Sequence, residues 1–312
     1  MQISCVCGLS LNCCFFVRRL LSILCFLGLS GAPNLTAAEA AKPLVVSSFT
    51  IIENWVQVIG DKQFELVNLV PSHSETHGYQ LNARNARDLR RANLIVGMSP
   101  TLEPWLEAWA KSNGRETQVL WLFDDRDTGH KGHAHCSDPH AWTNPAEVKK
   151  MTLILAKRLG GLRATDYTET SYRQYVKDID RVDEELRRLF STLPAGRRNL
   201  VTQHANLSHF AQSYGLRIAR TILTSSSAES ADPSARHFSE LLALIRREGI
   251  RVIVTDAGQS DAFAQRLAED AGLPAPLALS FEYLEPAGRP GDTWVGMMLH
   301  NGRRLHEALS HR

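Results

Sequence analysis

The chain has 312 residues, of which 44% are hydrophobic and 22% charged, and its formal net charge at pH 7 is +2. This length and composition suit a globular protein with one large or two medium-sized domains, whose core needs no disulfide to be stable. Such a small net charge indicates no basic face, so composition gives no reason to expect a nucleic-acid-binding protein.

The first forty residues have the features of a targeting segment. Arg18 and Arg19 precede an apolar run, and Ala38-Glu39-Ala40 offers a small-residue cleavage site. The apolar run is too short to span a bilayer comfortably, so we predict a signal peptide over 1–40 and a periplasmic mature protein. The seventeen residues before Arg18 are long and cysteine-rich for such a peptide. We therefore expect the true translation start to lie downstream.

Strand-like and helix-like segments alternate from residue 43 onwards. Apolar runs predict strands at 43–48, 65–70, 93–98 and 118–123. Helical spacing and capping residues predict the intervening helices, which end near Gly60, cover 83–92 and 104–111, and run from Asn144-Pro145 to about residue 159. This alternation is typical of a parallel sheet with helices on both faces.

Residues 165–193 interrupt the alternation. They contain neither glycine nor proline, and their apolar residues recur at near-helical spacing, which predicts one amphipathic helix. At 1.5 Å per residue this helix would be roughly 40 Å long, enough to link two lobes.

The alternation then restarts. Strands are predicted at 199–203, 216–223, 251–256 and 275–279, with helices between them and a last helix over 292–309. We therefore predict an α/β fold with two lobes, 43–160 and 198–312, each a parallel sheet flanked by helices. A ligand site is expected in the cleft between the lobes.

Four metal-capable residues follow predicted strands: His77, His140, His204 and Glu282. In open α/β sheets, ligands bind beyond the carboxyl ends of the strands, so these side chains are expected to meet at the cleft. Three neutral imidazoles and one carboxylate suit tetrahedral Zn²⁺. Each residue taken alone also fits an ordinary loop or cap position, and Glu75 is a rival for the carboxylate.

A second group of metal-capable residues lies in the run HKGHAHC. His130, His133 and His135 suit a solvated loop, which we expect to be at most a weak secondary collector of zinc. Five of the six cysteines lie in the targeting segment, so Cys136 is alone in the mature chain and cannot form an internal disulfide. We expect a free thiol there, with a weak extra ligand as the alternative. The remaining histidines carry no comparable signal: His73, His209, His237, His300, His306 and His311.

Sequence motifs of common enzyme classes are absent. The chain has no HExxH, no phosphate-binding glycine loop and no GxSxG, and no nucleophile–base pair is evident. We therefore predict that the protein is not an enzyme. A zinc hydrolase remains the alternative, because Glu75 or Glu282 could formally serve as a general base.

The segments LVPSHSETHGYQ, DPHAWTNP and VTQHANLSHFAQSYGL contain the three strand-end histidines. Together with their order along the chain, they resemble the periplasmic zinc and manganese solute-binding proteins of ABC transporters, over about 43–312. The resemblance implies two α/β lobes joined by a rigid helix, with the metal buried between them. It carries His77, His140 and His204 over as ligands, and Glu282 as the acidic ligand.

The resemblance also implies a function. The protein would be a monomeric receptor that captures Zn²⁺ as its transported ligand and delivers it to a membrane permease. A histidine in the third ligand position, His204, resembles the zinc members more than the manganese members. Alternatives are a receptor for manganese or another divalent metal, and a metal-binding adhesin.

Some positions depart from the pattern of the family. Thr76 replaces a proline, Asn144 replaces an aspartate, and Glu282 stands where many members have aspartate. The fourth ligand therefore stays open between Glu282, Glu75 and water. Because imidazole ligands must be neutral, we expect metal affinity to fall below about pH 6.5.

Overall fold

The computed structural model describes residues 41–123, 138–163, 167–223 and 234–311. The predicted signal peptide, the histidines of the HKGHAHC run and Cys136 lie outside the described residues. Lys42–Arg312 forms a single compact unit. None of the described helices is long and apolar enough to cross a membrane.

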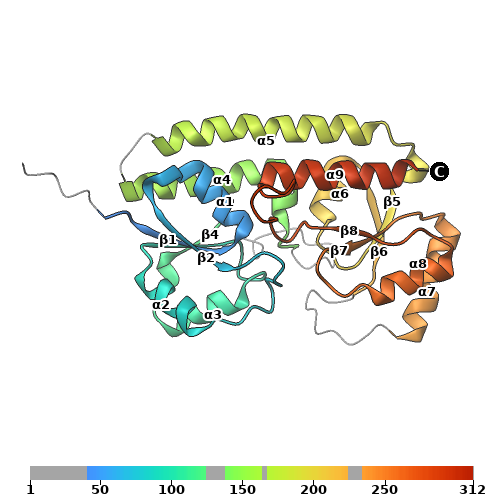
Figure 1. The fold of residues 1–312 in the computed structure, drawn as a ribbon, viewed down its shortest axis with the longest axis horizontal. Helices are drawn as coiled ribbons and strands as arrows, with labels where there is room; N and C mark the ends of the chain where they lie inside the picture. The colour runs from blue at the N-terminus through green and yellow to red at the C-terminus, as the bar shows by residue number, and fades with distance from the viewer. Residues whose placement is uncertain (1–40, 124–137, 164–166, 224–233, 312) are drawn as a thin grey trace, which may run out of the picture. The chain divides into compact units, whose positions relative to one another are not determined.

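The first lobe is built on a parallel sheet of four strands in the order β2-β1-β3-β4. The central strand β1 has all six residues buried, as expected for a parallel strand covered on both faces. Helices α1 and α4 lie on one side of this sheet, and α2 and α3 on the other (Figure 1). The elements are β1 (Leu44–Phe49), α1 (Thr50–Gly60), β2 (Glu65–Val70), α2 (Ala83–Arg91), β3 (Leu94–Gly97), α3 (Pro104–Ser112), β4 (Val119–Trp121) and α4 (Pro145–Arg163).

The second lobe repeats this plan. Its four parallel strands have the order β6-β5-β7-β8. Helices α7 and α8 pack together on one face of this sheet, around a separate apolar cluster. The elements are β5 (Asn199–Thr202), α6 (Ser208–Tyr214), β6 (Arg217–Thr221), α7 (Ala235–Glu248), β7 (Ile253–Asp256), α8 (Ala262–Ala271), β8 (Leu277–Leu279) and α9 (Trp294–Ser310).

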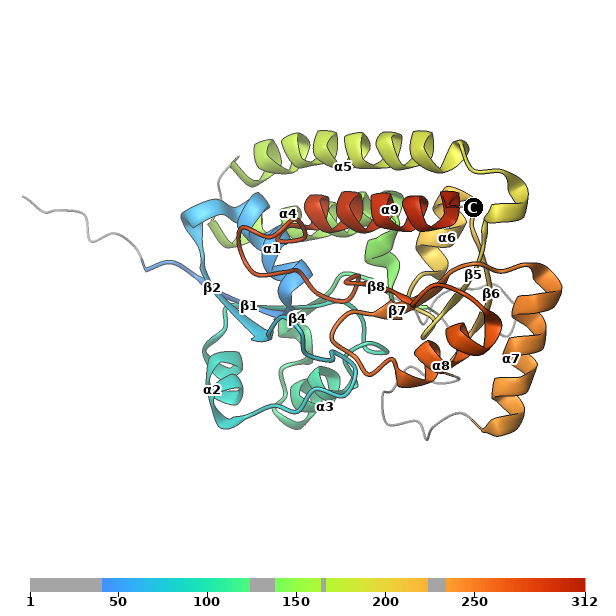
Figure 2. The same ribbon diagram turned by 45° about the vertical axis from the view of Figure 1, so that its right-hand side comes forward.

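Helix α5 (Tyr167–Ser191) connects the two lobes, as the sequence predicted. It runs beside α4 at one end and beside α9 at the other, and both views agree on this (Figures 1 and 2). Tyr175, Ile179, Val182 and Leu186 are buried at helical spacing and pack into the largest apolar cluster. At Gly302 of α9, an added Cβ would lie 2.4 Å from Leu186, so the glycine permits the close approach of α5 and α9.

The largest apolar cluster extends through both lobes. It contains residues of α1, α4, α5, β5, α9 and the turn before α4. Three fully buried tryptophans belong to it: Trp55, Trp142 and Trp294. The lobes therefore share a core on the side of α5. The lobe boundaries 43–160 and 198–312 remain our proposal for how the chain is divided.

Two predicted helix boundaries differ from the structure by about four residues. Helix α4 continues to Arg163 instead of ending near residue 159, and Gly160 lies where an added Cβ would come within 2.9 Å of Thr168. The glycine thus leaves room for the first turn of α5. The helix predicted directly after β5 begins only at Ser208, because residues 203–206 form a bend that brings His204 and Asn206 against Asp256.

Candidate metal centre

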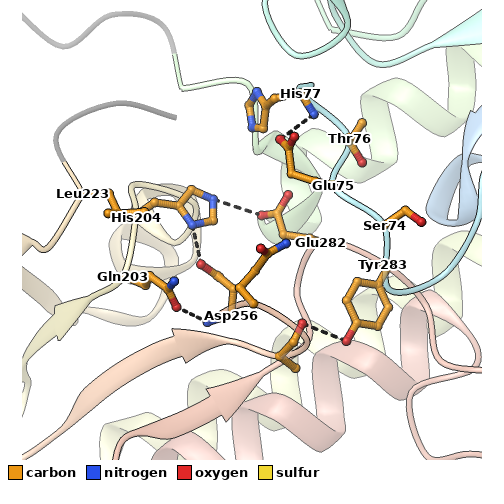
Figure 3. A pocket seen from close by; sticks show the side chains of 12 residues that line it. Ser74, Glu75, Thr76, His77, Gln203, His204, Leu223, Asp256, Glu282 and Tyr283 are labelled. Atoms are coloured by element: carbon orange, nitrogen blue, oxygen red, sulfur yellow. Dashed lines mark hydrogen bonds and ion pairs between the residues drawn. The ribbon is translucent and has the colours of Figure 1, made fainter. Parts of the chain in front are cut away.

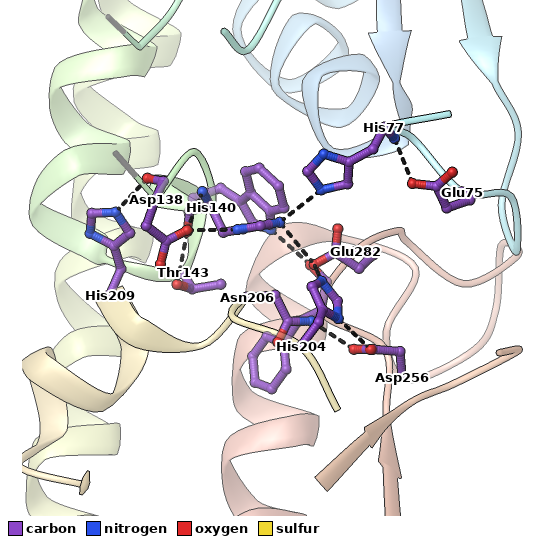
Figure 4. A network of polar contacts seen from close by, with 12 residues as sticks. Glu75, His77, Asp138, His140, Thr143, His204, Asn206, His209, Asp256 and Glu282 are labelled. Carbon is purple, nitrogen blue, oxygen red and sulfur yellow. Dashed lines mark hydrogen bonds and ion pairs between the residues drawn. The ribbon is translucent and has the colours of Figure 1, made fainter. Parts of the chain in front are cut away.

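The four strand-end residues predicted as ligands come together in the structure. One ligand-capable atom from each of His77, His140, His204 and Glu282 lies within 4.8 Å of the others (Figure 4). His77 Nε2 is 3.2 Å from His140 Nε2, and Glu282 Oε1 is 3.7 Å from the Nε2 atoms of His140 and His204. With bonds of about 2.0–2.1 Å, the ligand atoms of a tetrahedral zinc site are roughly 3.3 Å apart. The three separations of 3.2–3.7 Å are close to that value, and the remaining ones are at most 4.8 Å.

His77 lies in the loop after β2. Glu75 accepts hydrogen bonds from the backbone N–H groups of His77, at 2.9 Å, and Gly78, at 2.8 Å. The indole of Trp105 donates to the carbonyl of Thr76, at 2.8 Å, and fixes the other side of the loop. Glu75 therefore shapes the loop, and its carboxylate is not among the four atoms that converge.

His140 begins a short 3-10 helix, η4 (Ala141–Thr143), that leads into α4. Asp138 Oδ1 accepts from the backbone N–H of His140, at 3.0 Å, and pairs with the ring Nδ1 at 2.6 Å. Trp142 is fully buried, and its indole N–H donates to the Phe281 carbonyl at 2.7 Å. The DPHAW turn thus directs His140 Nε2 towards the other ligand-capable atoms.

His204 follows β5 and is oriented by a carboxylate in the same way. Its Nδ1 lies 2.5 Å from Asp256 Oδ2, and the Asn206 amide donates to Asp256 Oδ1 at 2.7 Å. Gln203 accepts from the backbone N–H of Asp256, at 3.0 Å. A carboxylate on Nδ1 fixes the tautomer and leaves Nε2 as the free ligand atom, which is the usual support for a metal-binding histidine.

Sequence reasoning did not assign these two carboxylates a role. Asp138 stands two residues before His140, and Asp256 ends β7, the parallel neighbour of β5. The position of Asp256 could have indicated its role, because the carboxyl ends of adjacent parallel strands meet at one edge of the sheet. The position of Asp138, two residues before a proposed ligand, could have done the same.

Glu282 lies after β8 in a buried segment. Its Oε1 atom is inaccessible to solvent and has no hydrogen-bond partner among the described residues. A buried acceptor without a hydrogen bond is costly, and here it faces three imidazoles. A bound cation would satisfy this oxygen. His77, His204 and Glu282 line one pocket, together with Ser74, Gln203 and Tyr283 (Figure 3).

The protonation of the cluster follows from burial and from its own charges. Burial and the neighbouring His140 lower the pKa of His77 to about 4, so this ring is neutral at pH 7. Burial would lower the pKa of His204, but Asp256 and Glu282 outweigh it and raise the pKa above its ordinary value. Burial would raise the pKa of Glu282, but the charges of His140 and His204 hold it well below its usual range. At neutral pH Glu282 is therefore a carboxylate.

The other described histidines stay outside the cluster, as expected. His209 Nε2 contacts the Asp138 carbonyl at 3.0 Å, and His237 Nε2 contacts the Ile222 carbonyl at 2.9 Å. His73 packs its ring on Tyr283, with the ring centroids 4.5 Å apart.

Residues 45–308 match the family of the zinc-uptake complex component A, periplasmic, also named ZnuA. The chain belongs to the ZnuA family. It is 26% identical to the zinc-binding lipoprotein AdcA of Streptococcus pneumoniae, over 93% of this chain and 60% of that protein. It is 22% identical to the manganese ABC transporter substrate-binding lipoprotein PsaA of Streptococcus anginosus, over 90% of this chain and 93% of that protein. The chain thus spans less than two thirds of AdcA.

Among solved structures, the ZnuA-family chain resembles the periplasmic zinc-binding protein TroA from Treponema pallidum. The TM-score is 0.78 at 24% identity, covering 87% of this chain and 100% of TroA. A metal-binding periplasmic protein from Candidatus Liberibacter asiaticus gives a TM-score of 0.75 at 19% identity, covering 86% of this chain and 100% of that one. These likenesses confirm the predicted fold class. The family is one of uptake components and not of enzymes, which agrees with the prediction from the sequence.

Proposed function

We propose that this ZnuA-family protein is a receptor that binds one Zn²⁺ and delivers it to an ABC-type membrane permease. The observation that carries the proposal is the convergence of three imidazole Nε2 atoms and one buried carboxylate oxygen without a hydrogen bond. We propose His77, His140, His204 and Glu282 as the ligands. The family's description as a periplasmic zinc-uptake component supports this reading.

The donor set favours zinc over manganese. Imidazole nitrogens suit Zn²⁺, whereas Mn²⁺ prefers carboxylate, carbonyl and water oxygens. Titration of the metal-free protein, lacking residues 1–40, against a zinc-responsive chelator dye tests the proposal. We expect one Zn²⁺ per chain and little displacement by excess Mn²⁺. Failure to compete with the dye would overturn zinc binding, and ready displacement by Mn²⁺ would favour a manganese receptor.

Delivery and compartment are further parts of the proposal. We propose that the protein acts as a monomer in the periplasm and hands its metal to a permease. In the source bacterium, deletion of the gene should impair growth in zinc-depleted medium and lower zinc uptake. Normal uptake in the deletion strain would contradict a role in transport and would favour an adhesin.

The two candidate carboxylates should behave differently when removed. Glu282→Ala deletes a proposed ligand and should weaken zinc binding by about two orders of magnitude. Glu75→Ala removes only hydrogen bonds to the backbone of His77 and Gly78, so we expect a loss of about ten-fold or less. The dye competition assay measures both. A larger loss for Glu75→Ala than for Glu282→Ala would identify Glu75 as the ligand.

Acidification should weaken zinc binding. Only a neutral imidazole binds metal. His77, with a pKa of about 4, stays neutral over the range tested, whereas His204, whose pKa Asp256 and Glu282 raise, must lose its proton to bind zinc. The affinity is therefore expected to decline steadily as the pH is lowered from 7.5 to 5.5, while circular dichroism shows a folded protein. A flat affinity profile over this range would show that histidines are not the dominant ligands.

A further inference from the structure

The segment that contains Glu282 follows β8 of the second lobe, but its backbone is bonded to the first lobe. The Phe281 carbonyl accepts from the Trp142 indole at 2.7 Å. The Leu284 N–H donates to Thr50 Oγ1 at 2.8 Å, and the Leu284 carbonyl accepts from Ser72 Oγ at 2.7 Å. These three bonds flank Glu282 on both sides.

The partners of these bonds come from different first-lobe elements. Thr50 begins α1, Ser72 lies in the loop that leads to His77, and Trp142 lies in the turn after His140. The same loop and the same turn contain two of the proposed ligands. Glu282, His77 and His140 are therefore tied together by hydrogen bonds that need no metal.

The segment also contacts the second lobe. The Asn301 amide of α9 donates to the Ser280 carbonyl at 3.0 Å, two residues before Glu282. The Tyr283 hydroxyl donates to the Ala257 carbonyl at 3.0 Å, and the Phe281 ring lies 5.2 Å from that of Phe210. These contacts hold Ser280 and the side chains of Phe281 and Tyr283, whereas the backbone bonds at Phe281 and Leu284 go to the first lobe.

His204 contrasts with the other three ligands. Its Nδ1 pairs with Asp256, and Asp256 is held in turn by Gln203 and Asn206, all of the second lobe. Across the cluster, His204 Nε2 is 3.7 Å from Glu282 Oε1.

We infer that the proposed zinc site is divided three to one: the first lobe positions His77, His140 and Glu282, and the second lobe positions His204 alone. Thr50 and Ser72 are then positioning residues that act on the metal through Glu282. This inference rests on the proposed function. It concerns what holds Glu282 in place, since the residue itself follows β8 of the second lobe. As a consequence, His204 is the ligand that approaches or leaves the metal during capture and release, while the other three ligands stay together.

A double-mutant cycle tests the inference. Thr50→Val with Ser72→Ala removes both hydroxyls at little cost in volume. We expect about ten-fold weaker zinc binding in the otherwise wild-type protein, and less than a two-fold change in a Glu282→Gln background, because the effect passes through Glu282. The matched control is Thr152→Val, which removes a buried hydroxyl bonded at 2.6 Å to the Val148 carbonyl within α4, and should leave affinity unchanged.

Equal losses in the two backgrounds would overturn the inference, and so would no loss in either. A second measurement is independent of zinc. Amide hydrogen exchange at Leu284 in the metal-free protein should be about ten-fold faster in the Thr50→Val variant. Unchanged exchange would show that the tether does not exist. If the wild-type protein binds no zinc, the proposed function fails, and the exchange result still decides whether the first lobe holds the segment.

Discussion

Replacing His140 with alanine should weaken zinc binding by about two orders of magnitude or more without unfolding the protein. His140 is 2% exposed, and its Nε2 lies 3.2 Å from His77 Nε2 and 3.7 Å from Glu282 Oε1, so it is close to two of the other three proposed ligand atoms. Loss of a residue that only supports a ligand costs about 10–100-fold in metal affinity. Loss of a ligand itself should reach or exceed the upper end of that range.

The experiment measures zinc affinity by dye competition and secondary structure by circular dichroism. His306→Ala is the control, because His306 contacts Thr192 and lies on α9, away from the cluster. Its affinity should equal that of the wild type. An unchanged affinity in the His140→Ala variant would remove His140 from the site and, with it, the carried-over ligand set.

Much of this architecture could be predicted from the sequence, because the strands of a parallel sheet follow general rules of topology. Four residues were predicted as ligands because the carboxyl ends of parallel strands lie at the same edge of a sheet. They are His77, His140, His204 and Glu282. The structure brings all four together. The long helix was equally accessible, since 165–193 contains no residue that would break it.

The supporting contacts could not be predicted in the same way. The pairing of Asp256 with His204 depends on the register of β5 and β7, which are separated by about fifty residues of chain. The bond from Leu284 to Thr50 joins positions 234 residues apart. No local pattern encodes such a contact, because it results from how the two lobes pack around their shared core. For the same reason, nothing in the sequence indicates that first-lobe residues bond to the backbone beside Glu282.

Replacing Trp142 with alanine should lower the free energy of unfolding by about 3–5 kcal/mol. Trp142 is fully buried in the cluster that spans both lobes, and its ring lies 5.2 Å from that of Phe49. Its indole N–H donates to the Phe281 carbonyl, and its own carbonyl accepts from the Trp294 indole at 2.8 Å. The substitution would therefore leave a large cavity and a buried carbonyl without its donor.

Urea-induced unfolding of the metal-free protein measures this effect, because bound metal would add its own stabilisation to the native state. Trp142→Phe separates packing from hydrogen bonding: it keeps most of the ring and loses the donor, so we expect a loss of about 1–3 kcal/mol. Trp109→Ala, at a half-buried position on α3, is the matched control and should cost less than Trp142→Ala. Because His140 packs edge-on against Trp142, with ring centroids 5.1 Å apart, Trp142→Ala should also weaken zinc binding. An equal cost for both Trp→Ala variants would mean that the turn after His140 does not join the site to the core.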